Sequence, residues 1–192
     1  MRLSRHTPLA EASDELLMEL VVFGKQEALR ELYDRYFKLL CRFAHGFVKD
    51  EAQAEDAVQE VFITIMRKAD SYKPDKKFRT WMLSLCANHC KNLLRNEANR
   101  GRIMQEKLTA TETSMELNHS LDRAKLKEEI ARMLESCSAK ENELYHLRFE
   151  MDLNVKEIAQ ILEIPEGSVK SGLFYLIKKL RVPLKALYHE YR

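Results

Sequence analysis

Apolar residues recur at intervals of three and four along most of this chain, which is the spacing of amphipathic helices. In the first half the pattern predicts four helices. The first covers about 14–23, the second is long with apolar positions from Ala28 to Phe47, the third begins near Asp50 with apolar positions from Ala54 to Ile65, and the fourth covers about 78–96. Ser13 is placed to cap the first helix, Gly24 ends it, and a polar stretch around Pro74 separates the last two. One side of the third helix is expected to be buried, and it consists of Ala54, Ala57, Val58, Val61, Phe62 and Ile65.

The second half of the chain twice places a polar cap before an apolar stripe. Residues 138–141 have the spacing of a capping box, and residues 154–157 repeat it at the start of a short helix that is expected to end at Leu162. A tight turn and Pro165 then lead to a second amphipathic helix over 166–180. This order is that of a helix-turn-helix, whose second helix enters the major groove of DNA. A plain three-helix bundle without DNA is the alternative interpretation of the pattern.

Between the two halves the chain changes character. Residues 98–123 are polar, rich in Thr, Glu and Asn, and have no sustained stripe, which is typical of a flexible linker. We therefore expect an all-α protein of two small helical domains, 1–97 and 124–192, joined by this linker. The low counts of Gly (5) and Pro (4) agree with few turns.

No apolar run is long enough to cross a bilayer and no signal-type stretch is seen, so we expect a cytoplasmic protein without membrane insertion.

The net charge of +2 conceals an alternation of acidic and basic blocks. Residues 11–60 carry 12 acidic and 6 basic side chains, whereas residues 67–102 carry 3 acidic and 10 basic ones. Residues 103–163 are again acidic, with 13 against 8, and residues 164–192 are basic, with 6 basic against 2 acidic. One block of charge is usually a solvated surface, but two basic blocks far apart in sequence indicate two contacts with a polyanion.

The helix over 166–180 carries one of these basic blocks. At about 100° per residue, its core side is expected to hold Val169, Leu173, Leu176, Ile177 and Leu180. Opposite them, or at the flank, lie the hydroxyls, lysines and aromatics of Lys170, Ser171, Phe174, Tyr175, Lys178 and Lys179. Such a surface suits phosphates and base edges. Gly172 lies on the flank, where it either allows close approach of DNA or, as we prefer, marks a lost basic contact.

The fourth helix and the loop before it carry the other basic block. The inner side is expected to hold Phe78, Trp81, Met82, Leu85, Cys86, His89 and Leu93. This makes His89 a packed core residue, and Trp81 taken alone is also best explained as core. The outer side and its flank hold Thr80, Ser84, Ala87, Asn88, Lys91, Asn92 and Arg95. The loop adds Lys73, Lys76 and Lys77 beside Tyr72, and basic residues interleaved with aromatic ones suit single-stranded nucleic acid.

The third helix exposes an acidic, amide-bearing patch made of Glu55, Asp56, Gln59 and Glu60. Because this patch repels DNA, we expect a protein partner with basic residues to bind it. The sequence shows no carboxylate pair in an apolar pocket, no glycine-rich phosphate loop and no nucleophilic triad, so we expect neither catalytic residues nor a cofactor. Cys86, His89 and Cys90 fall within one turn but lack a fourth ligand, so the four cysteines are expected to be buried thiols and not a metal site.

Three stretches resemble regions 2 and 4 of the sigma-70 family of RNA polymerase subunits. They read AEDAVQEVF (54–62), KPDKKFRTWM ahead of LCANHCKNLLR (73–95), and VKEIAQILEIPEGSVKSGL (155–173). The short two-domain layout resembles that of the extracytoplasmic-function group, and the resemblance covers about residues 14–97 and 124–187. It departs from the family at Glu163, where the turn usually has glycine, at Ser138-Ala139 in place of Leu-Pro, and at Gly172 and Tyr175, where basic residues are common.

By position, the resemblance implies three sites. Asp56, Gln59 and Glu60 would bind the β′ coiled coil of core RNA polymerase. The -10 element would be melted and read by the 70–77 loop and the fourth helix, through Lys73, Lys76, Lys77, Asn88, Lys91, Asn92 and Arg95. The -35 element would be read by Ser168, Lys170, Ser171, Phe174, Tyr175 and Lys178. The implied partners are polymerase core, through its β′ coiled coil and β flap, promoter DNA, and an anti-sigma factor of the kind that clamps many members of the family.

We therefore expect a transcription initiation factor that supplies promoter choice and strand opening, while catalysis belongs to the polymerase. The alternative is a helix-turn-helix regulator that acts without polymerase core. The acidic patch at 55–60 argues against this alternative, because such a regulator has no need of it.

Overall fold

The structure is a computed structural model. It describes residues 8–73, 77–103, 130 and 132–190, and of these it describes 99–103 and 182–190 by their backbone alone. Every regular element in these residues is a helix, and no strand occurs among them. The all-α fold predicted from the spacing of apolar residues is therefore confirmed. None of the helices in the described part is long and apolar enough to cross a membrane.

The chain divides into two compact units. The first holds Met1–Gln105 with Gln160–Leu162, and the second holds Glu106–Ala159 with Glu163–Arg192. The predicted domain boundaries stay predictions, because most of the expected linker over 98–123 lies outside the described residues.

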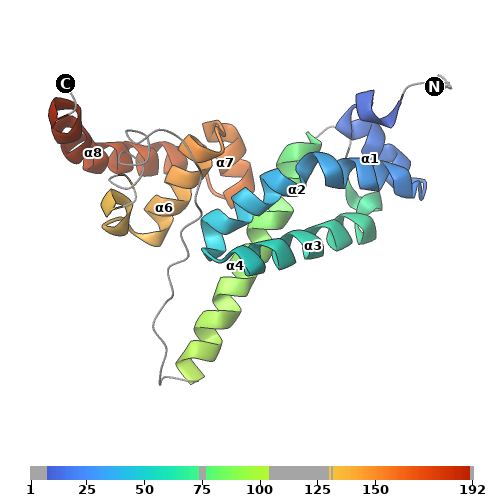
Figure 1. Ribbon diagram of the computed structural model, residues 1–192, viewed down its shortest axis with the longest axis horizontal. Coiled ribbons are helices and arrows are strands. Elements are labelled where there is room, and N and C mark those ends of the chain that lie inside the picture. The colour runs from blue at the N-terminus through green and yellow to red at the C-terminus, as the bar shows by residue number, and fades with distance from the viewer. Residues whose placement is uncertain (1–7, 74–76, 104–129, 131, 191–192) are drawn as a thin grey trace. The chain divides into compact units, whose positions relative to one another are not determined.

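The first unit contains four α-helices and two short 3-10 turns among its described residues (Figure 1). In chain order they are η1 (Leu9–Glu11), α1 (Asp14–Val22), α2 (Gln26–Val48), α3 (Glu51–Arg67), η2 (Ala69–Ser71) and α4 (Phe78–Ile103). The Ser13 hydroxyl accepts the Leu16 amide at 3.2 Å and so caps α1, as predicted. Asp50 caps α3 in the same way, accepting the Gln53 amide at 2.7 Å. Each cap satisfies an amide that the first helical turn leaves unpaired.

The core of the first unit forms where α2, α3 and α4 pack on one another and on α1. All six residues predicted to face inward on α3 are buried, and Ile65 among them is fully enclosed. Around them lie the fully buried side chains of Leu17, Met18, Leu32, Leu40, Phe43, Phe78, Met82 and Leu83. Burying one such side chain contributes about 1.5–3 kcal/mol. The apolar stripes therefore account for the way these helices face the core.

α4 differs from its prediction in two respects. The buried side of α4 consists of Phe78, Met82, Leu83, Cys86, Ala87 and Cys90. This side is rotated about the helix axis relative to the predicted one. Ala87, predicted to face outward, is fully buried, whereas His89 is only half-buried. The reason is that α4 packs against both α2 and α3, so its buried arc is set by two neighbours at once. The helix also continues to Ile103, because a single Gly101 costs only about 1 kcal/mol and does not end a helix.

The second unit contains α6 (Ala139–Tyr145), most of α7 (Val155–Leu162) and α8 (Glu166–Glu190), with a π-helical turn η3 (His146–Glu150) after α6. Residues 130 and 132–135, before α6, are also helical. Both predicted capping boxes are present. The Ser138 amide donates to Glu141 at 2.7 Å and the Asn154 amide donates to Glu157 at 3.0 Å, each with the reciprocal bond. These boxes begin α6 and α7 where the sequence placed them. In η3 the buried His146 ring contacts the Glu150 carboxylate.

The turn between α7 and α8 is tight, as predicted. Glu163 ends α7 in the left-handed region with φ 57°, and the Ile164 amide bonds back to the Ala159 carbonyl at 3.1 Å. A non-glycine residue pays a strain of roughly 1–2 kcal/mol in that conformation. Four of the five residues predicted to face inward on α8 are buried, but Ile177 is 51% exposed. At about 100° per residue, Ile177 lies at the edge of the apolar stripe of α8.

Candidate functional site

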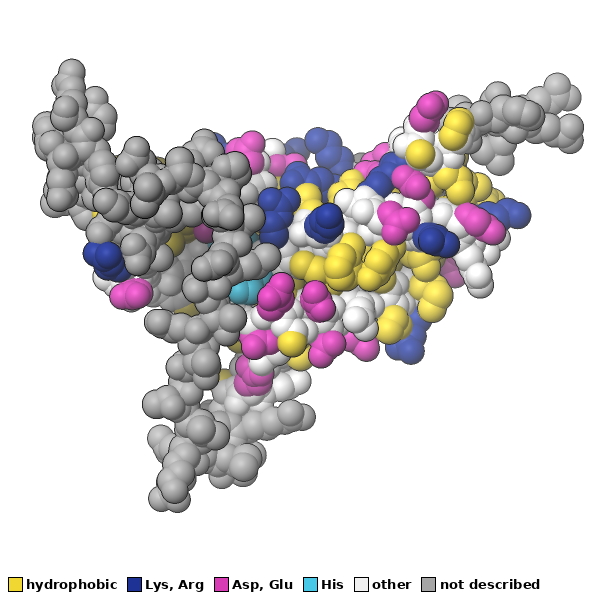
Figure 2. Space-filling view, in the orientation of Figure 1, with side chains coloured by type: hydrophobic (Ala, Val, Ile, Leu, Met, Phe, Trp, Pro, Cys, Tyr) yellow, Lys and Arg dark blue, Asp and Glu magenta, His cyan; other side chains and the backbone are white. Residues whose placement is uncertain are grey.

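The outer face of α3 is acidic. Glu55, Asp56, Gln59 and Glu60 are all exposed, whereas Ala57, Val58 and Val61 between them are buried. Figure 2 shows Asp and Glu side chains gathered over α3. The predicted exposure of this patch is confirmed, while its role stays a prediction.

An aromatic group, which was not predicted from the sequence, lies beside the acidic face. Tyr33 of α2 stacks on Phe37 with ring centroids 5.0 Å apart and meets Phe62 of α3 at 4.8 Å. Tyr33 and Phe37 are half-buried, and Met66 at the end of α3 is exposed. Figure 2 shows hydrophobic side chains in a band between α2 and α3. The i, i+4 spacing of the aromatic residues Tyr33 and Phe37 is the sequence signal that could have indicated this group.

The polar face of α4 gathers the residues predicted to contact the -10 element. Asn88, Lys91, Asn92 and Arg95 follow an i, i+3, i+4, i+7 spacing, which places them on one side of the helix. Asn92 and Arg95 are exposed, and Asn88 and Lys91 are half-buried. In the preceding loop Lys73 and Lys77 are exposed, and Lys76 lies outside the described residues.

Tyr72 and Trp81 do not offer free rings to nucleic-acid bases. Tyr72 is only 8% exposed, and its ring lies 5.2 Å from that of Trp81 and 6.0 Å from that of Phe78. Trp81 is half-buried against the same two rings. The interleaving of basic and aromatic residues, which suited single-stranded nucleic acid, therefore does not provide a stacking ring at Tyr72, because that ring packs against Phe78 and Trp81 of α4.

The exposed face of α8 carries the residues predicted to read the -35 element. These are Ser168, Lys170, Ser171, Phe174, Tyr175 and Lys178, and all six are exposed. Phe174 and Tyr175 are 64% and 63% exposed, and their rings meet edge-on at 5.5 Å. The Ser171 hydroxyl donates to the Gly167 carbonyl at 2.9 Å, which leaves its oxygen able to accept. Adjacent exposed rings on a polar helix face are typical of a surface that binds a partner.

Lys179 has a structural role. Its ammonium donates to the Ser136 carbonyl at 2.6 Å and lies 3.2 Å from the Glu141 carboxylate, so it ties α8 to the start of α6. The pKa of Glu141 is lowered, first by hydrogen bonds from Ser138 and then by Lys179.

Gly172 also has a packing role. A Cβ built on it would lie 2.4 Å from Leu144 Cδ1 of α6. No pair of carbon atoms approaches so closely without a shift, so the missing side chain is what lets the buried Leu144 pack on α8. The structure thus explains the glycine by helix packing, and a lost basic contact or a close approach of DNA is not needed.

The cysteines are free thiols of two kinds. Cys86 and Cys90 are fully buried, whereas Cys41 and Cys137 are half-buried, so the expected burial holds only for the first pair. A hydrogen bond to Cys90, reinforced by burial, raises the pKa of the Cys86 thiol and keeps it protonated at neutral pH. Within the described residues no group of three or more His, Cys, Asp or Glu side chains is placed to hold a metal ion.

Two protein-family models match the chain in the order of its units. The model of Sigma-70 region 2 matches residues 32–100, which include the outer faces of α3 and α4. The model of Sigma-70, region 4 matches residues 133–182, which include α6, α7 and the exposed face of α8.

Curated proteins with similar sequences carry related descriptions. The ECF RNA polymerase sigma factor SigL of Mycobacterium tuberculosis is 30% identical over 166 residues, which cover 83% of this chain and 90% of SigL. The ECF RNA polymerase sigma-E factor of Escherichia coli is 28% identical over 173 residues, covering 85% of this chain and 90% of that factor.

Two solved structures share the fold. CnrH, in complex with the cytosolic domain of CnrY, matches with a TM-score of 0.65 and 22% identity over 91% of this chain and 99% of that chain. The sigma factor RpoE of Bartonella quintana, in complex with the anti-sigma factor NepR, matches with a TM-score of 0.65 and 21% identity, covering 81% and 96% of the two chains.

Proposed function

The chain belongs to the extracytoplasmic-function group of the sigma-70 family and is an alternative sigma factor that directs RNA polymerase to promoters; we propose that three of its surfaces divide this work. The acidic face of α3 binds polymerase, the polar face of α4 and the loop before it open and read the -10 element, and the exposed face of α8 reads the -35 element. The observation that carries the proposal is that all three faces are polar sides of helices whose apolar sides are buried.

The α3 face is suited to a basic protein surface. Asp56, Gln59 and Glu60 occupy neighbouring positions on one side of the helix, and all are exposed. The half-buried rings of Tyr33 and Phe37 add apolar area at its edge. Aromatic side chains that a partner can cover are enriched in protein interfaces. We assign it to the β′ coiled coil of the polymerase core.

The α4 and α8 faces are suited to two forms of DNA. On α4, amides and cations alternate along one side, which matches a single strand whose phosphates and bases are both accessible. On α8, Ser168, Lys170 and Ser171 lie in the first turns of the helix, the part that reaches base edges in the major groove. Phe174 and Tyr175 follow on the same side, where thymine methyls and sugars are available contacts.

Further partners follow from the same assignment. The second unit would bind the β flap of polymerase. An anti-sigma factor that covers the polar faces would hold the protein inactive, and the complex of RpoE with NepR is a precedent for the fold. The protein acts where the polymerase and the chromosome are, in the cytoplasm, and it supplies no catalytic group of its own.

The test is reconstitution. Core polymerase that is mixed with the purified chain is expected to bind and transcribe a subset of the duplexes in a randomised library. The selected duplexes are expected to share sequences near positions -10 and -35 relative to the transcription start. The chain alone is expected to bind those duplexes weakly. Tight, sequence-specific duplex binding by the chain alone, with no transcription when core is added, would favour a regulator that acts without polymerase.

A further inference from the structure

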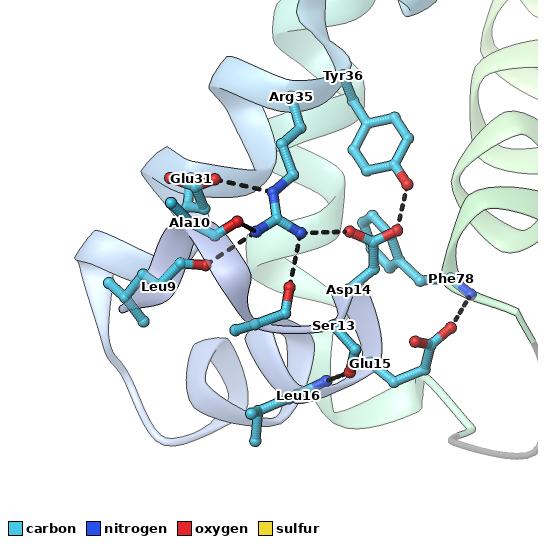
Figure 3. Close-up of polar contacts among 11 residues, drawn as sticks. Leu9, Ala10, Ser13, Asp14, Glu15, Leu16, Glu31, Arg35, Tyr36 and Phe78 are labelled. Carbon is cyan, nitrogen blue, oxygen red and sulfur yellow. Dashed lines mark hydrogen bonds and ion pairs between the residues drawn. The ribbon is translucent and has the colours of Figure 1, made fainter. Parts of the chain in front are cut away.

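Arg35 of α2 holds the segment that precedes α1. A guanidinium has five N–H donors, and every one of them has an acceptor here (Figure 3). The acceptors, at 2.8–3.0 Å, are the carboxylates of Glu31 and Asp14 and the carbonyls of Leu9, Ala10 and Ala12. A lysine has three donors on one nitrogen and could not span these positions. Arg35 thus fixes η1 and the start of α1 to the middle of α2.

Two adjacent carboxylates extend this arrangement to the start of α4. The Asp14 carboxylate accepts the Tyr36 hydroxyl, and the Tyr36 ring meets the Phe78 ring edge-on at 5.8 Å. Glu15 Oε1 accepts the backbone amide of Phe78 at 3.4 Å (Figure 3). This amide belongs to the first residue of α4, where no carbonyl of the helix is available to it. A carboxylate at that end is also favoured by the helix dipole.

Phe78 in turn anchors the loop that precedes α4. Its fully buried ring lies 6.0 Å from the Tyr72 ring and 6.1 Å from the Trp81 ring. Lys73 and Lys77 therefore lie between two residues, Tyr72 and Phe78, that belong to one aromatic cluster. Any movement of the Phe78 backbone would move both the end of the loop and the first turn of the helix.

We propose that Glu15 is a positioning residue for promoter opening: by holding the Phe78 amide it sets the start of α4, and Arg35 secures the segment that places Glu15. This inference rests on the proposed role of α4 and its loop in strand opening. Glu15 itself lies on none of the three faces assigned to polymerase or DNA. It acts on the strand through the helix.

Trp81 provides a test that does not depend on the proposed function. It is the single tryptophan of the chain, so its emission reports on the cluster around Phe78. Glu15→Ala is expected to shift the emission to the red and to increase quenching by acrylamide. Glu19→Ala, at an exposed position on the same helix, is expected to change neither. Identical emission and quenching for Glu15→Ala and the wild type would overturn the proposal.

The second measurement uses the full chain with core polymerase and a duplex that the wild-type holoenzyme selects from a random library. Opening is followed by the permanganate reactivity of unpaired thymines, and core affinity by competition. Glu15→Ala is expected to lower the opening rate roughly three- to tenfold, as the loss of one ordinary hydrogen bond gives, with unchanged core affinity. Glu15→Gln keeps an oxygen acceptor and is expected to recover most of the rate.

The outcomes separate the inference from the function on which it rests. If core affinity and opening rate fall by the same factor, Glu15 only stabilises the unit, and the positioning role is wrong. An opening rate equal to that of the wild type has the same consequence. If the wild-type holoenzyme selects no duplex, the proposed function fails, while the fluorescence of Trp81 still decides whether Glu15 positions α4.

Discussion

At the scale of single residues, Gly172 sets how closely two helices approach. Its α-carbon faces Leu144 of α6, and an added methyl group would lie 2.4 Å from that side chain. Gly167, in the first turn of the same helix, has no atom within 4 Å of the corresponding position. The two glycines of α8 thus differ in the space that is available to a side chain.

This difference leads to a stability prediction. Gly172→Ala is expected to lower the free energy of unfolding of the second unit by about 1–3 kcal/mol, the usual cost of overpacking. Gly167→Ala is expected to be neutral or to stabilise by up to about 1 kcal/mol, because alanine favours the helix. Urea unfolding of the two variants measures both effects. Equal stability of the two variants would show that Leu144 moves aside without cost.

Glu141 gives a prediction about pH. Hydrogen bonds from Ser138, together with Lys179, lower the pKa of Glu141 in the folded state. The stabilisation is therefore complete above the ordinary glutamate pKa of about 4.3 and is lost as the pH falls through the lower, folded-state pKa. Glu141→Gln is expected to be less stable than the wild type at neutral pH, with a difference that shrinks on acidification.

Urea unfolding at successively lower pH values measures the difference. Glu135→Gln, at an exposed position before α6, provides the matched control. If the difference in unfolding free energy between Glu141→Gln and the wild type did not change as the pH is lowered, the charge of Glu141 would not contribute to stability.

At the scale of elements, α3 was fully predictable and α4 was not. The apolar residues of α3 form one stripe, and all six are buried as expected, which left the acidic side as its outer face. α4 packs on two neighbours, so its buried arc includes Leu83 and Ala87, which a single stripe does not contain. The caps at Ser13, Ser138 and Asn154 were predictable because each acts within three residues.

Contacts between distant positions were beyond the sequence patterns. Arg35 binds carbonyls more than twenty positions earlier in the chain, and no local spacing marks such a pair. The burial of Tyr72 has the same origin, since it depends on how the loop folds back onto Trp81. The spacing of neighbouring residues was therefore enough to predict the helices and their polar faces. The contacts that orient those faces join residues far apart in the chain and could be found only in the three-dimensional structure.

The exposed face of α3 leads to a prediction about polymerase binding. Gln59→Ala is expected to weaken binding to core polymerase about tenfold, because truncation of a central contact in an interface costs upwards of 1 kcal/mol. Gln26→Ala, an exposed glutamine at the start of α2, is the matched control and is expected to bind core as the wild type does. Competition with a labelled sigma factor for core measures both affinities. Unchanged affinity of Gln59→Ala would remove this face from the interface.

At the scale of the whole molecule, the two surfaces proposed to contact DNA belong to separate compact units. Lys91 and the polar face of α4 lie in the first unit, and Tyr175 and the exposed face of α8 lie in the second. Substitutions that share no partner usually add in free energy within about 0.3–0.5 kcal/mol. The polymerase that carries both units is then the means by which the two contacts act on one promoter.

The prediction is that Lys91→Ala and Tyr175→Ala have separable and additive effects on initiation. Lys91→Ala is expected to slow promoter opening and leave duplex binding at -35 intact, whereas Tyr175→Ala is expected to weaken binding only when the -35 element is present. In the double variant, the reduction in initiation is expected to equal the product of the reductions measured for the two single variants. Run-off transcription with core polymerase on duplexes with and without the -35 element measures each contribution. A double variant no worse than the poorer single variant would mean that both residues serve one step, and the division of promoter recognition between the two units would fail.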